Sequence, residues 1–269
     1  MATQKGIISL SGKVGDLIFS EHQGKTRAKA KSAKPMNQTV ATKKSSSDFG
    51  EASKVGARMR LAFTPLIKKY GDTTIVSRFT KQILKIFSTI PSSFTGQKKL
   101  SQGNIGIFRD FQLNTSAKLD SLLHQQPKIK LEANGLKISF EENTTANLFK
   151  WVAKSKTAVL QLLVYSLNFD GEDEVIRVKD LIIDVDDAYF RGAHLRIPLN
   201  LSGEQAVYVA LGIHYFGQEQ FMIGDKTKRA AAIIYAARLS DGMEVSMATE
   251  QPIAVKKEKE EGSIGWELL

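Results

Sequence analysis

The apolar residues of this 269-residue chain change their spacing near residue 127, and this change constrains the fold more than any other feature. Before it, hydrophobic side chains recur every three or four positions, as on one face of an α-helix. After it, they alternate with polar residues, as in a half-buried β-strand. The chain is therefore expected to be α+β, with helices first and antiparallel strands after them.

The helical part is expected to open with two helices. The first should begin at Ser47 or Asp48, because both are good N-caps and a glutamate follows Asp48 at the capping-box position. Pro65 should kink or split this helix, since proline removes a backbone hydrogen bond. Gly71 should end it, and a second amphipathic helix should follow and stop at Pro91. The short connection predicts an antiparallel α-hairpin with basic outer faces.

The β-rich part should begin with a hairpin, because Asn134-Gly135 lies between two alternating apolar runs. Further strands are expected over residues 158–169, 175–185, 195–201, 206–216, 231–239 and 243–249. Closely spaced strands with turn residues between them favour an antiparallel, immunoglobulin-like β-sandwich. The alanine-rich segment 230–239 could instead be helical. The sandwich core is expected to hold the aromatic residues Trp151, Tyr165, Tyr189, Tyr208, Tyr215 and Phe216.

The N-terminal residues are expected to form a strand or hairpin followed by a basic arm. Gly12 and Gly15 bracket two residues, a spacing that suits a tight turn with positive φ. No apolar residue larger than alanine occurs from Thr26 to Pro35, so this stretch cannot bury itself. Its cations alternate with small residues, which places them on one side of an extended segment. The residues predicted to contact a partner or polyanion are Lys25, Arg27, Lys29, Lys31, Lys34, Lys43 and Lys44.

These features divide the chain into four expected regions. They are an N-terminal strand and basic arm at 1–46, a helical region at 47–127, a β-sandwich domain at 128–250 and a charged tail at 251–269. Charge is distributed unevenly among them. Residues 1–110 hold 20 Lys and Arg against 6 Asp and Glu, whereas residues 111–269 hold 18 against 22. A basic end implies an acidic partner, such as nucleic acid, an anionic membrane or the acidic half of another copy.

The sequence carries no recognisable catalytic, cofactor or metal-binding pattern. The absence of cysteine excludes disulfides, thiolate catalysis and cysteine-based metal sites. The histidines are isolated from one another and from carboxylates at ligand spacing. The aspartates around Asp184 lack the pattern of a calcium loop, and the Gly12–Gly15 segment lacks that of a phosphate-binding loop. We therefore expect a non-enzymatic protein with no cofactor, metal ion or small-molecule substrate.

No apolar run reaches the length of a signal peptide or of a transmembrane helix. We therefore expect no membrane span, and synthesis in the cytoplasm without a signal peptide. Whether the product stays there or leaves the cell as a released particle is open at this point.

Gly6, Gly12 and Gly15 stand in the pattern G-[IL]-x-x-x-x-G-x-[IV]-G, and the basic residues 25–44 and the helix 49–70 follow them. This arrangement resembles an uncharacterised family of short Bacteroidota proteins, in which such a strand leads into a basic arm, a helix and a C-terminal β-sandwich. The resemblance implies a fold and a host lineage, and no activity. The present chain differs by a longer helical section and a longer tail.

Three functions fit these observations. The first is a structural protein that self-assembles into a filament, tube or particle, because basic and acidic ends permit head-to-tail contacts that propagate. An extended N-terminal segment can also add to the sheet edge of a neighbour. The second is a nucleic-acid-binding protein, nucleoid-associated or virion-like, that uses the basic arm. The third is an adaptor β-sandwich. The expected partner is another copy of the chain, with nucleic acid as the alternative; assembly symmetry and biological trigger are left open.

Overall fold

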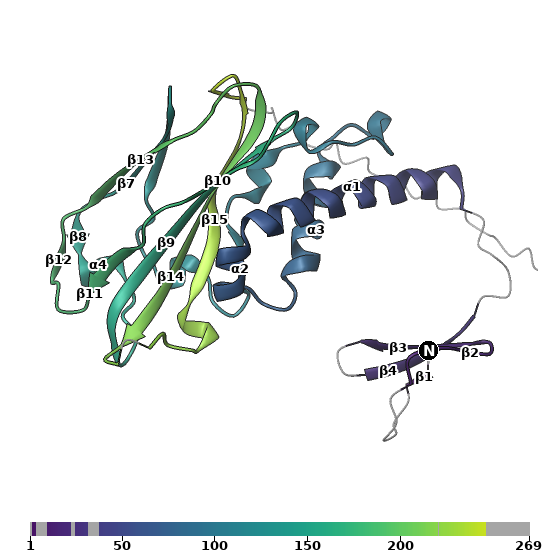
Figure 1. The fold of residues 1–269 in the computed structure, drawn as a ribbon, viewed down its shortest axis with the longest axis horizontal. Coiled ribbons are helices and arrows are strands. Elements are labelled where there is room, and N and C mark those ends of the chain that lie inside the picture. Colours follow the sequence, from purple (N-terminus) through teal and green to yellow (C-terminus); the bar gives the residue numbers. More distant parts are fainter. Residues whose placement is uncertain (1, 4–9, 23–24, 32–37, 220, 246–269) are drawn as a thin grey trace, which may run out of the picture. The chain divides into compact units, whose positions relative to one another are not determined.

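The computed structural model describes residues 2–3, 10–22, 25–31, 38–219 and 221–245. The chain folds into two compact units, Met1–Lys44 and Ser45–Leu269. The described residues form four α-helices and several sheets in which the strands pair antiparallel, so the protein is mixed α+β as the sequence predicts (Figure 1). None of the helices in this part of the chain has both the length and the hydropathy that a membrane crossing requires.

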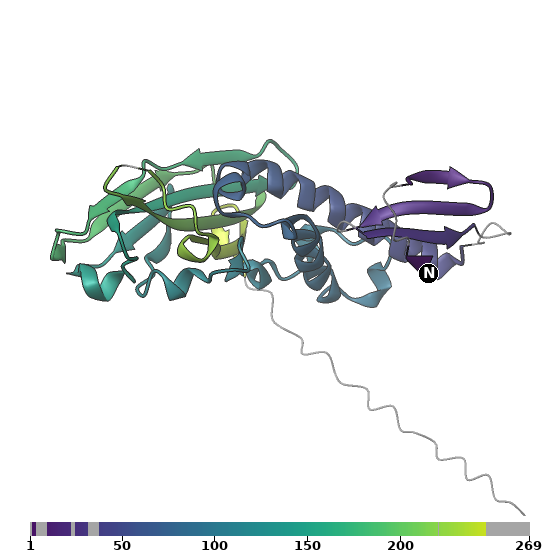
Figure 2. The same cartoon turned by 90° about the horizontal axis from the view of Figure 1, so that it is seen from below.

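The first unit contains a four-stranded sheet in the order β1-β4-β3-β2 (Figure 2). Its strands are β1 (Ala2–Thr3), β2 (Gly12–Val14), β3 (Leu17–His22) and β4 (Lys25–Ala30). The prediction of a free arm is wrong for β4, which pairs with β3 along its whole length. Pairing satisfies the backbone polar groups of this segment even though its side chains have no core to enter.

Helix α1 (Val40–Ala62) begins well before the predicted start at Ser47 or Asp48. Thr39 acts as the cap, because its Oγ1 accepts a hydrogen bond from the Thr42 N–H at 3.2 Å. Asp48 is buried inside the helix, where its carboxylate accepts hydrogen bonds from the backbone N–H groups of Gly96 and Lys98 at 3.0–3.2 Å. The predicted N-cap role of Asp48 is therefore wrong, because its carboxylate binds backbone N–H groups of Gly96 and Lys98 and not those of the first turn of α1.

Pro65 splits the helix as predicted, since α1 ends at Ala62 and α2 (Thr64–Tyr70) begins with the proline in its first turn. Helix α3 (Ile75–Ser88) buries the face that the periodicity predicts, although Val76 is exposed. Gly56 of α1 lies against α3, where an added Cβ would stand 3.4 Å from the Ile83 side chain. A short fourth helix, α4 (Thr145–Leu148), lies among the strands.

The second unit is built on a seven-stranded sheet with the order β10-β9-β14-β15-β16, in which β11 also pairs with β9 and β5 with β15. Its strands are β5 (Phe111–Gln112), β9 (Ser155–Asn168), β10 (Glu174–Arg177), β11 (Leu181–Asp184), β14 (Glu204–Gly217), β15 (Ala230–Ser240) and β16 (Met243–Glu244). A three-stranded sheet contains β6 (Lys128–Glu132), β7 (Gly135–Phe140) and β13 (Ala193–Pro198). Strands β8 (Asn143–Thr144) and β12 (Tyr189–Phe190) form a separate pair.

Strands β9 and β14 are buried on both faces, because the small sheet covers one face and the helices cover the other (Figure 1). On the first face, Leu160 and Val209 share a hydrophobic core with Ile138 of β7. On the second face, the Tyr165 ring meets the Phe63 ring edge-on, with centroids 5.6 Å apart. Burial on both faces explains why these two strands are nearly continuous apolar runs.

Most of the predicted strands are found, although one of them is divided in two. The hairpin at Asn134-Gly135 is confirmed, and the segment 230–239 is a strand and not a helix. Residues 175–185 form two strands, β10 and β11, instead of one. Tyr189 is 50% exposed, so its predicted place in the core is wrong. Residues 246–249 of the last predicted strand and the tail at 251–269 lie outside the described residues.

Candidate interaction surface

The N-terminal sheet is organised by a two-residue turn at Gly15-Asp16. Gly15 has a φ of 57° and Gly12 a φ of 108°, values that favour glycine. The turn joins β2 to β3, and the Lys31 N–H donates to the carbonyl oxygen of Asp16 at 2.7 Å. The prediction of a tight turn with positive φ is right for Gly15, but the two residues bracketed by the glycines belong to β2 and not to the turn.

The strand register gathers cations on one face of this sheet. Ile18 of β3 lies directly opposite Lys13 of β2 on one side and Lys29 of β4 on the other. Directly opposite residues share a face, and alternate residues along a strand return to it. Lys25 and Arg27 therefore lie on the same face as Lys13 and Lys29, and none of the four pairs with a carboxylate among the described residues. We call these four residues the cationic face.

The opposite side of the same sheet is mostly apolar, with Glu21 and Thr26 at one end. Val14 lies opposite Leu17, and Leu17 lies opposite Ala30, while Phe19 lies opposite Ala28. Val14 is 60% exposed and Leu17 is 43% exposed. We call the face formed by Val14, Leu17, Phe19, Ala28 and Ala30 the apolar face. None of the side chains described in the Met1–Lys44 unit is buried, so the sheet has no core of its own within the described residues.

The structure brings together only some of the predicted contact residues. Lys25, Arg27 and Lys29 share the cationic face, and exposed Lys31 lies directly after β4. Lys43 and Lys44 are placed on helix α1, which corrects their assignment to an arm. Lys34 lies outside the described residues. Lys13 was not predicted, although counting alternate positions back from the Gly15 turn would have found it.

The basic helix faces expected from the sequence are partly used inside the second unit. The Arg58 guanidinium forms two hydrogen bonds of 2.6 Å to the Asp173 carboxylate, and a third of 2.7 Å to the Asn168 carbonyl oxygen. These contacts with Asp173 raise the pKa of Arg58. Arg78 binds Asp72 at 2.9 Å, and it also donates to the carbonyl oxygens of Gln112 and Leu113. Both arginines are therefore neutralised by their own chain and are poorly placed to bind a polyanion.

A chain of polar side chains crosses the interface between α2 and the large sheet. The Tyr70 hydroxyl donates to Gln161 Oε1 at 3.2 Å, and Tyr70 Oη lies 2.8 Å from His214 Nδ1. The amide of Gln161 donates to Asp180, and the Lys69 ammonium group lies 3.4 Å from His214 Nε2. Burial, together with the charges of Lys69 and Arg229, lowers the pKa of His214 to about 3. The imidazole is therefore neutral at pH 7 and serves packing.

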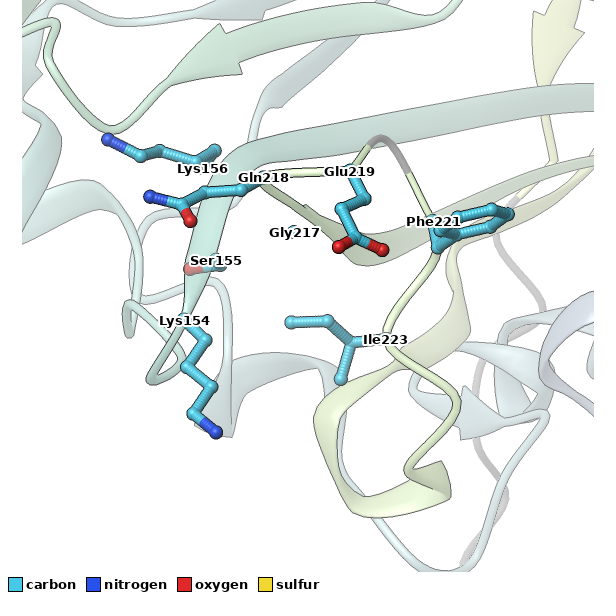
Figure 3. A pocket seen from close by; sticks show the side chains of 8 residues that line it. All are labelled: Lys154, Ser155, Lys156, Gly217, Gln218, Glu219, Phe221 and Ile223. Atoms are coloured by element: carbon cyan, nitrogen blue, oxygen red, sulfur yellow. The ribbon is translucent and has the colours of Figure 1, made fainter.

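An open hollow of about 510 Å³ lies where β9 begins and β14 ends (Figure 3). Lys154, Lys156 and Glu219 line it, and the two lysine side chains point in different directions. The hydroxyl of Ser155 donates to the Val152 carbonyl oxygen at 2.6 Å, and no hydrogen bond among the described residues joins it to a His, Asp or Glu side chain.

The described residues contain no group of three or more His, Asp or Glu side chains placed to hold a metal ion. Comparisons with protein-family models, with curated proteins and with solved structures found no significant match.

Proposed function

We propose that this protein is a non-enzymatic structural protein that assembles with copies of itself through its Met1–Lys44 unit. The observation that carries the proposal is a sheet with an exposed apolar face and no buried side chain among its described residues. A sheet of this size needs a covered hydrophobic face to be stable. A second copy of the chain is the partner that would always be present at matching concentration.

The charge of the unit supports contact with an acidic surface. Residues 1–44 hold nine Lys and Arg against two Asp and Glu, a net charge of +7. The sheet can therefore make two kinds of contact with neighbouring copies. Its cations can orient an acidic surface of a neighbour, and its apolar side chains can bury hydrophobic area against a neighbour. The product of such repeated contacts would be a filament, tube or particle, depending on whether the rotation between copies closes.

Substitutions on the apolar face test this proposal. Val14→Ser combined with Leu17→Ser should convert the assembled protein into monomers, because both side chains lose the burial that assembly provides. Analytical ultracentrifugation and negative-stain microscopy give the readout. Leu61→Ser combined with Val76→Ser is the matched control, since both residues are exposed on helices of the second unit.

Two results would contradict self-assembly. A wild-type protein that stays monomeric over a wide range of concentrations would exclude it. Assembly of the Val14/Leu17 variant at wild-type strength would exclude the apolar face as the contact.

A second candidate function is binding of nucleic acid by the cationic face. The observation that favours it is the grouping of Lys13, Lys25, Arg27 and Lys29 on one side of a sheet, with no carboxylate partner among the described residues. Contacts between such cations and phosphates release counterions, so affinity for duplex DNA should fall steeply as salt is raised. No binding to random duplex DNA at low salt would exclude this candidate.

We also propose that the seven-stranded and three-stranded sheets of the second unit form an immunoglobulin-like β-sandwich. Its support is that their strands pair antiparallel and that both sheets contribute to one core. An experimental structure that shows another strand topology would contradict it.

A further inference from the structure

The large sheet of the second unit has an open edge. Strands β10 and β11 both pair with β9, one after the other along its length, from Glu174 opposite Ser166 to Asp184 opposite Thr157. No other strand of the described residues pairs with their outer side. Open edges present unpaired backbone N–H and C=O groups, and proteins usually protect them.

This edge is strongly acidic at both ends. Residues 170–187 hold eight Asp and Glu against only Arg177 and Lys179, a net charge of −6. Asp173 forms an ion pair with Arg58, and Asp180 accepts a hydrogen bond from the Gln161 amide. Asp170, Glu172 and Asp186 are exposed, and only the last makes a weak ion pair, 4.0 Å from Lys156. The free carboxylates therefore lie in the loops that flank the two strands. The two cations lie in the middle of the segment, Arg177 at the end of β10 and Lys179 between β10 and β11.

The edge also exposes apolar side chains. Val175 of β10 is 42% exposed and Ile182 of β11 is 62% exposed. Both lie on the helix side of the sheet, because Val175 is opposite Tyr165 and Ile182 is opposite Val159. An open strand edge with exposed branched residues and flanking carboxylates has the features of a surface that accepts another sheet.

We propose that this edge of one copy receives the Met1–Lys44 unit of a second copy. The inference rests on the proposed function and names the surface that completes it. A unit of net charge +7 meets an edge of net charge −6. The edge carries exposed Val175 and Ile182 beside its charges, whereas the unit carries exposed Val14 and Leu17 on the face opposite its cations. Because the two surfaces belong to different parts of the chain, the contact is head-to-tail and each added copy leaves one surface of each kind free.

Charge reversal on each surface tests the pairing. An edge variant, Asp170→Lys with Glu172→Lys, Asp186→Lys and Asp187→Lys, changes the net charge of residues 170–187 from −6 to +2. It should lose assembly, because a cationic edge repels the cationic face. A face variant, in which all four residues of the cationic face are replaced by Glu, makes that face anionic and should lose assembly because the acidic edge repels it. An equimolar mixture of the two variants should assemble again, since each variant's edge then matches the other's face. The exposed residue Asp120 provides the control substitution Asp120→Lys, which should assemble like the wild type.

The outcomes separate the two proposals. Circular dichroism first establishes that every variant is folded. If the face variant fails to assemble while the edge variant assembles normally, the edge is not the receiving surface, although self-assembly through the N-terminal unit stands. If both variants fail and their mixture also fails, the direct pairing of these two surfaces is wrong. If the wild type does not assemble, both proposals fail together.

Discussion

At the scale of single residues, His214 couples the stability of the protein to pH. Its pKa is lowered to about 3 by burial and by neighbouring cations, against an ordinary value of 6.5. Because the folded pKa is below the unfolded one, protons bind preferentially to the unfolded chain at acidic pH. The stabilising contribution is complete above about pH 6.5 and is lost as the pH falls toward 3. Between pH 6.5 and pH 5 the loss should be about 2 kcal/mol.

This pH dependence can be measured by urea unfolding at several pH values. His214→Gln should make the free energy of unfolding depend less on pH than in the wild type over this range. His194 is exposed, so His194→Gln should keep the wild-type slope. Equal slopes in the His214 variant and the wild type would contradict the assignment of the effect to this imidazole.

Two buried tyrosines differ in what their hydroxyl groups contact. The Tyr165 hydroxyl donates to Asp173 at 2.7 Å, whereas the Tyr208 hydroxyl has no hydrogen-bond partner among the described residues. Tyr165→Phe should lower the free energy of unfolding by about 1.5–3 kcal/mol, the usual worth of a hydrogen bond to a charged group. Tyr208→Phe should leave it unchanged or raise it. Denaturant unfolding of both variants side by side checks the contrast, and equal losses would refute it.

At the scale of secondary-structure elements, replacing two different glycines by alanine should change the stability of the protein in opposite directions. A Cβ at Gly212 of β14 would stand 2.6 Å from the Tyr70 ring, so this glycine allows α2 to approach the sheet closely. Gly212→Ala should destabilise the protein by about 1–3 kcal/mol, as overpacking does. Gly50 lies inside α1 with no atom within 4 Å of an added Cβ, so Gly50→Ala should stabilise it by about 0.5–1 kcal/mol. Thermal unfolding measures both changes, and a loss of stability at Gly50 would contradict the open space assigned to it.

Strand β15 illustrates how an element can be ambiguous in sequence. Its register with β14 shifts between Val209 and Ala210, and the neighbours Ile234 and Tyr235 both pack against the same core. A bulge of this kind interrupts the alternation that identifies a strand. The alanine content of β15 also favours a helix, and pairing with β14 makes the segment a strand.

At the scale of the whole molecule, all the buried hydrophobic side chains identified lie at Ala52 or beyond. A chain lacking residues 1–44 should therefore unfold cooperatively, with a melting temperature close to that of the full chain. Calorimetry or circular dichroism checks this, with the full-length protein as the control. Loss of a cooperative transition in the truncated chain would show that the second unit depends on the first.

The N-terminal part of the sequence is basic and the C-terminal part acidic, but in the folded molecule some of these opposite charges lie in contact. Arg58 belongs to the basic half and Asp173 to the acidic half, and the two form an ion pair at 2.6 Å. Part of the opposite charge is therefore satisfied within one chain. Among the described residues, the cationic face and the carboxylates of Asp170 and Glu172 at the β10–β11 edge form no such pair.

The sequence by itself determined the class of the two main helices and of most long strands, because periodicity and breaking residues act locally. Pro65 divides the helix, Gly15 lies in the turn and Asn134-Gly135 lies at the hairpin. Each of these features follows from residues close together in the sequence. The start of α1 was missed for a tertiary reason, since Asp48 binds Gly96 and Lys98 instead of its own helix.

Only the tertiary structure decided which residues share a surface. The pairing of β4 with β3 turned the expected basic arm into a sheet with a cationic face and an apolar face. The pairing of β10 and β11 with β9 left an acidic edge open, although no local pattern marks an edge strand. Register and pairing depend on contacts between residues far apart in the chain, and spacing along one sequence does not encode them.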